Sequence, residues 1–85
     1  MKAKTYNLEI AGDAYSGTAV EIVKAMQATA FFERDKPVEE YLDSLPESLE
    51  RFTGKRIALA GRTFPERAES LLRELVRIGV ATEDT

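Results

Sequence analysis

The segment 19–32 constrains the fold of this chain more than any other stretch. Only four of its fourteen residues are polar: Glu21, Lys24, Gln27 and Thr29. The remaining side chains are apolar on every side of a helix drawn through the segment. A helix that is apolar nearly all round is buried against more than one neighbour. The sequence therefore predicts a helix over 19–32 that contacts protein on at least two sides.

Two arrangements of this helix satisfy the pattern, and the sequence leaves both open. In the first, the helix is central, between a sheet and a second helix. In the second, its outer strip of Ala25, Ala28, Phe31 and Phe32 contacts another chain, since small residues allow close approach. A chain of 85 residues buries a limited share of its surface, and this one has no cysteine for disulfides. Self-association is the common remaining means of stabilisation.

Alternating residues predict a small sheet. Tyr6, Leu8 and Ile10 share one face of a strand over 4–10, which is typical of a half-buried strand. A turn at Gly12-Asp13 and a short second strand over 15–17 would complete a hairpin. Residues 56–60 alternate again, with Ile57 and Leu59 inward, and 80–82 is a further short candidate strand.

Helices are expected over 19–32, 36–43, 45–53 and 64–78. Their starts carry a serine or threonine three residues before a glutamate, which is typical of a capping box: Thr18/Glu21, Ser44/Glu47 and Thr63/Glu66. Asp35 before Pro37 is a looser cap. An apolar stripe also fits one helix over 36–53, kinked at Pro46: Val38, Tyr41, Leu42, Leu45, Leu49 and Phe52. We expect a single α+β domain over 1–85, with three to four helices packed on one face of a small sheet.

Composition excludes much chemistry. The chain has no histidine and no cysteine, so it lacks the usual general base, the thiolate nucleophile and the commonest metal ligands. No segment approaches the length of an apolar membrane span. We therefore expect no enzymatic activity, no cofactor, no metal, no small-molecule substrate and no membrane insertion. The acidic face of 36–53 is interpreted as solvated, or as a docking face for a basic partner.

Nucleic-acid binding is the alternative function. Segment 55–78 carries six basic and three acidic residues, and Arg62, Arg67, Arg73 and Arg77 are its candidate phosphate contacts. Glu69 and Glu74 are interleaved with them, and the whole chain has a net charge of -3. No base-stacking aromatic cluster accompanies the arginines. This pattern is more typical of a salt-bridged surface than of a nucleic-acid interface.

These inferences together predict a small, non-catalytic interaction or accessory protein of the cytoplasm. We expect it to form a homodimer, or to bind another protein, through Ala25, Ala28, Phe31 and Phe32. A nucleic-acid-binding regulator that uses segment 55–78 is the alternative.

Overall fold

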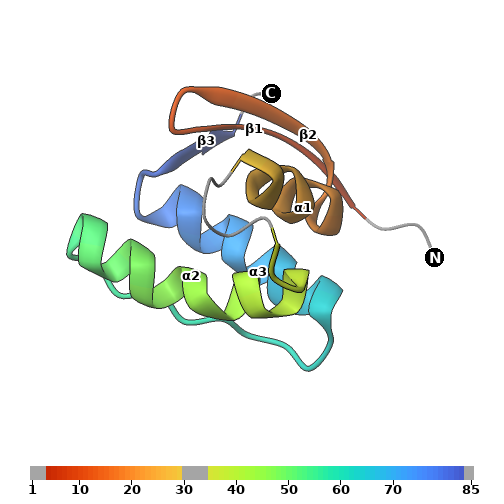
Figure 1. Cartoon of the computed structure of the whole chain (residues 1–85). Coiled ribbons are helices and arrows are strands. Elements are labelled where there is room, and N and C mark those ends of the chain that lie inside the picture. The colour runs from red at the N-terminus through yellow and green to blue at the C-terminus, as the bar shows by residue number, and fades with distance from the viewer. Residues whose placement is uncertain (1–3, 30–34, 84–85) are drawn as a thin grey trace.

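The computed structural model describes residues 4–29 and 35–83, and it shows an α+β arrangement. The described elements follow the order β1 (Thr5–Ile10), β2 (Asp13–Thr18), α1 (Ala19–Thr29), α2 (Val38–Thr53), α3 (Phe64–Arg77) and β3 (Ala81–Glu83). The strands form an antiparallel sheet in the order β2-β1-β3, with β1 in the middle. The helices lie on one face of this sheet (Figure 1). The α+β class and the short C-terminal strand predicted from the sequence are confirmed.

The hairpin turns at Ala11-Gly12, one residue earlier than predicted. Ile10 lies opposite Asp13, so the loop has two residues, and both have a positive φ of 53° and 90°. Such a type I′ turn matches the twist of the two strands that it joins. β2 begins directly after this turn and continues to Thr18, so it has six residues instead of the predicted three.

The core lies between the sheet and the helices. Tyr6, Leu8 and Ile10 are buried on the inner face of β1, as their alternation predicted. Opposite them, α1 contributes Ile22 and Val23, and α3 contributes its three leucines, Leu71, Leu72 and Leu75. α1 contacts β2, α3 and α2, so it holds the sheet and the helices together.

The predicted strand over 56–60 is wrong. This segment is extended but joins no strand, and it passes along the far side of the helices from the sheet (Figure 1). Side chains of α3 hold its main chain instead: the amide of Ala60 donates to Ser70 Oγ at 2.9 Å. Ile57 is buried and Leu59 is half-buried. The alternation therefore did indicate that one side of this segment is buried. The elements that bury it are helices and not a sheet.

Residues 38–53 form one helix, so the two separate helices over 36–43 and 45–53 are wrong and the single-helix alternative holds. Pro46 lies inside α2, and the Ser44 hydroxyl donates to the carbonyl of Tyr41 at 2.8 Å instead of capping a new helix. α2 begins after Pro37, with no side-chain cap from Asp35. Phe52, the last residue of the predicted apolar stripe, is 90% exposed. Gly54, with a φ of 74°, ends the helix as a left-handed cap.

Candidate interaction surface

The outer side of α1 is open to solvent. Ala25 and Ala28 are both exposed, whereas Ile22 and Val23 on the inner side are fully buried. α1 ends at Thr29 within the described residues, and Phe31 and Phe32, the other two predicted interface residues, lie outside them. The two alanines therefore have the position that an interface on this helix requires. Whether they contact a second chain stays a prediction.

The first turn of α1 is fixed directly to the last residue of β2. The amide of Thr18 donates to Glu21 Oε1 at 2.8 Å, and the amide of Glu21 donates to Thr18 Oγ1 at 3.2 Å. This is the capping box that the sequence predicted. The bond from the Thr18 amide lowers the pKa of Glu21, so its carboxylate is favoured. As a result, α1 leaves the strand without a loop and keeps a fixed position beside β2.

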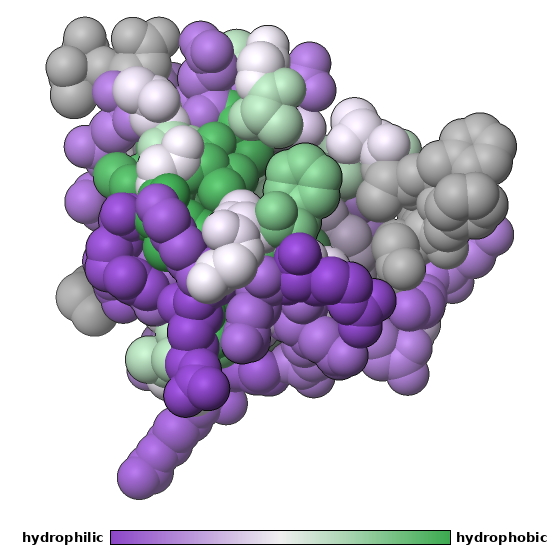
Figure 2. Space-filling view, turned by 90° about the vertical axis from the view of Figure 1, so that its left-hand side faces the viewer, coloured by the Kyte–Doolittle hydropathy of each residue, from purple (hydrophilic) through white to green (hydrophobic). Residues whose placement is uncertain are grey.

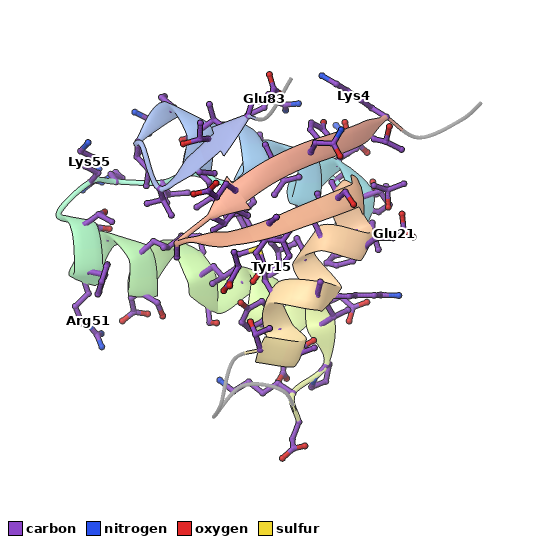
Figure 3. The ribbon with its side chains drawn as sticks, turned by 90° about the horizontal axis from the view of Figure 1, so that it is seen from above. Lys4, Tyr15, Glu21, Arg51, Lys55 and Glu83 are labelled. Carbon is purple, nitrogen blue, oxygen red and sulfur yellow. The ribbon has the colours of Figure 1, made fainter. Side chains whose placement is uncertain are left out.

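β2 forms one edge of the sheet, a feature that the sequence did not predict. In the part of the chain that the structure describes, β2 pairs with β1 on one side and with no strand on the other. In Figure 3, α1 runs out from beneath this edge, and Tyr15 lies at the edge. Tyr15 is half-buried, while Ala14 and Ser16 are exposed. The open edge of β2 therefore passes over α1, the helix that carries Ala25 and Ala28.

Lys4 and Glu83 lie at the opposite edge of the sheet (Figure 3). A hollow of about 150 Å³ opens there between β1, β3 and α3, with Leu8, Leu72 and Val76 among its apolar lining. The ammonium of Lys4 lies 4.9 Å from the centre of the Tyr6 ring, which also lines the hollow. Burial, and then the negative charge of Glu69, raise the pKa of Tyr6. No group in this lining has the arrangement of a nucleophile with its base.

A second apolar area lies on the face that carries the hairpin turn, the connection from α3 to β3 and the C-terminal half of α2. Figure 2 shows its green atoms bordered by hydrophilic ones. The partly buried apolar side chains of these elements include Leu45, Leu49 and Val80, and all three pack against the core. This area is therefore the solvent-facing margin of the core.

The four candidate phosphate-binding arginines do not form one patch. Arg67 forms an ion pair with Asp43 of α2, and Arg77 pairs with Glu74 at 2.6 Å. Arg77 also donates to the carbonyl of Arg56, and Glu74 raises the pKa of its guanidinium. Arg73 lines the hollow beside Tyr6, and Arg62 is exposed in the connection before α3. At 3.6 residues per turn, Arg67 lies about 120° around α3 from Arg73.

Carboxylates are also dispersed. Within residues 4–29 and 35–83, no three side chains of the metal-ligating types come together. On the acidic face of α2, Glu47 pairs with Arg51 at 3.1 Å and Asp43 pairs with Arg67. In the same described ranges, no helix has the length and apolar character needed to cross a membrane.

Comparison with known proteins adds no identity: no protein family, no curated protein and no solved structure matches this chain.

Proposed function

We propose that this chain is a small, non-catalytic interaction protein of the cytoplasm that functions as a homodimer. The observation that carries the proposal is the exposure of Ala25 and Ala28 on a helix that otherwise packs against β2, α2 and α3. Side chains this small allow a second helix to approach closely. A symmetric dimer brings the same surface together from two copies, which is the commonest arrangement in homo-oligomers.

The absence of histidine and cysteine from the sequence supports a role without catalysis. We assign no reaction to the hollow beside Tyr6, because the charged side chains that line it are exposed to solvent. They are Lys4, Arg73 and Glu83. Binding is therefore the activity that these residues favour. We propose no cofactor and no small-molecule substrate.

Sedimentation velocity over a range of concentrations tests the proposal. At about 100 µM, a dimer with a micromolar dissociation constant is almost fully formed, and dilution should convert it to monomer. A single monomeric species at all concentrations up to 100 µM would exclude self-association as the function.

Nucleic-acid binding remains the alternative, with weaker support. Of its four arginines, Arg67 lies about 120° around α3 from Arg73. Arg67 and Arg77 are already paired with carboxylates. An interface for phosphates needs several free cations on one surface.

A further inference from the structure

We propose that the hollow beside Tyr6 binds a free α-amino acid that has an apolar side chain. The side chain of the ligand lies in the hollow, and its carboxylate and ammonium pair with charged residues at the rim. This site goes beyond the proposed homodimer and does not depend on it. The residues around the hollow belong to β1, β3 and α3, with Lys4 directly before β1, whereas the proposed interface lies on α1.

The floor of the hollow is apolar. Tyr6 and Leu8 of β1 and Leu72 of α3 line it, and all three side chains are buried. Val76, about one turn after Leu72 on α3, also lines the hollow but is 40% exposed. An apolar ligand would cover this valine, and removal of apolar surface from water is favourable.

The volume of the hollow limits the size of the ligand. It is about 150 Å³, and an engineered apolar cavity of about this volume in another protein binds benzene. One ring or one branched chain therefore fits. Pockets for larger ligands have about 300–1,000 Å³, so nucleotides and most organic cofactors are too large for this site.

Charges of both signs lie at the rim. Lys4 and Arg73 supply two cations and Glu83 supplies a carboxylate, and all three side chains are exposed. Within residues 4–29 and 35–83, none of the three takes part in an ion pair. Glu69 also acts electrostatically on Tyr6, as Arg73 and Glu83 do, but it lies outside the lining. The rim therefore offers partners for an anion and for a cation at the same time.

The sheet places two of these charges on the side of the apolar floor. Glu83 lies opposite Leu8 in the pairing of β3 with β1, and directly opposite residues share one face of a sheet. Lys4 lies at the same edge as Glu83 (Figure 3), and its ammonium is 4.9 Å from the centre of the Tyr6 ring. A charge at the end of an edge strand also hinders unwanted pairing, which accounts for Glu83 but not for the two cations.

A free amino acid matches the rim in both signs. Its carboxylate pairs with Lys4 or Arg73, its ammonium pairs with Glu83, and its side chain contacts the floor. A simple carboxylic acid would place an anion beside Glu83 without a cation of its own, and a peptide carries its two charged ends on different residues. The lining contains no nucleophile with a base, so the amino acid is a ligand and not a substrate.

Titration of the full chain with L-phenylalanine, followed by amide chemical shifts in NMR, tests the site. We expect shifts at the residues that line the hollow and a dissociation constant of about 1 mM, because the ligand is small and its ion pairs are exposed. 3-Phenylpropanoate lacks the ammonium, phenethylamine lacks the carboxylate and L-serine lacks the apolar side chain. Each should bind more weakly than L-phenylalanine. Absence of shifts at the lining up to about 10 mM L-phenylalanine, or equal binding of 3-phenylpropanoate, would overturn the proposal.

Glu83→Gln separates recognition of the ammonium from recognition of the carboxylate. It should raise the dissociation constant of L-phenylalanine about two- to fivefold, as expected for one exposed ion pair, without weakening 3-phenylpropanoate. Lys4→Gln combined with Arg73→Gln should weaken both ligands. Glu9→Gln is the matched control, since Glu9 is next to Leu8 in β1 but lies on the exposed face of the sheet. It should weaken neither ligand.

The variants also decide against the proposal if the rim is not used. If Glu83→Gln and the double variant both leave the dissociation constant of L-phenylalanine unchanged, the rim charges do not recognise the ligand and the proposal is wrong. Neither result bears on self-association, which sedimentation measures without ligand, so the two proposals fail separately.

Discussion

Thr18 and Glu21 exchange two hydrogen bonds across the junction of β2 and α1, at 2.8 and 3.2 Å. Thr18 is therefore both the last residue of a strand and the cap of a helix. This double role fixes the direction in which α1 leaves the sheet.

Loss of either threonine cap should destabilise the protein. Thr18→Ala and Thr63→Ala each leave a first-turn amide without its acceptor, Glu21 N–H in α1 and Glu66 N–H in α3. We expect each variant to lose about 1 kcal/mol in the free energy of unfolding, measured by denaturant titration. Thr29→Ala is the control, since its exposed hydroxyl caps no helix start and donates only to the carbonyl of Met26. Unchanged midpoints in both cap variants would contradict these helix starts.

The bond to Thr18 also makes stability depend on pH through Glu21. Because this bond lowers the pKa of Glu21 from the ordinary 4.5, the folded state favours the carboxylate more than the unfolded state does. Its contribution is therefore complete above pH 4.5 and is lost as the pH falls through the lowered pKa. The difference in unfolding free energy between the unmodified chain and Glu21→Gln should shrink in acid. A difference that grows as the pH falls would contradict this assignment.

Replacement of Ala11 in the hairpin turn should raise the stability of the protein. Ala11 has a φ of 53°, a left-handed conformation that a residue with a Cβ adopts only at a cost. Asn-Gly is the favoured pair for this turn, so Ala11→Asn should raise the free energy of unfolding by about 0.5–1 kcal/mol. Ala14→Asn, in the adjoining strand, is the matched control and should not stabilise. A loss of stability in Ala11→Asn would show that the turn has another geometry.

The sequence predicted well those structural features that depend on residues close together in the chain. The alternation of Tyr6, Leu8 and Ile10 and the caps at Thr18 and Thr63 depend on residues a few positions apart, and all of them are confirmed. Ser44 shows the limit of such patterns. Its spacing to Glu47 also fits the middle of a helix, where the hydroxyl bonds back to a carbonyl, as Ser44 does.

The features that depend on distant contacts were missed. Ile57 and Leu59 alternate as in a strand, but the pattern does not tell whether a strand or a helix lies beside the main chain. The open edge of β2 was missed for a related reason, since strand order is decided by how β3 returns to β1. For the helix over 19–32, the sequence left open a central position between the sheet and a second helix, or a contact with another chain. α1 does lie between β2 and α2. Ala25 and Ala28 are exposed, and their contact with another chain stays a prediction.

Nucleic acid should bind weakly or not at all. Arg67 and Arg77 are held by carboxylates, so two of the four candidate phosphate contacts are already paired. Each cation that is paired in this way is less available to replace the counterions of a phosphate. A fluorescence titration with mixed-sequence duplex at low salt should reach half-saturation only above about 10 µM. Tight, salt-sensitive binding that Arg73→Ala with Arg77→Ala abolishes would instead favour the alternative function. Arg51→Ala removes a cation outside segment 55–78. It is the control and should leave any such binding unchanged.

Ala28→Glu distinguishes an interface on α1 from a purely structural role of this helix. Ala28 is exposed, so the glutamate side chain extends into solvent in a single copy and the monomer should fold normally. In the dimer the same carboxylate is placed between two helices, where an unpaired buried charge is strongly unfavourable. Sedimentation should therefore show dimer converted to monomer, while circular dichroism retains its helical signal. Ala60→Glu, at another exposed alanine, is the matched control and should remain a dimer. If Ala28→Glu unfolds the chain at concentrations where the unmodified protein is a monomer, Ala28 contributes to the core and the α1 interface is wrong.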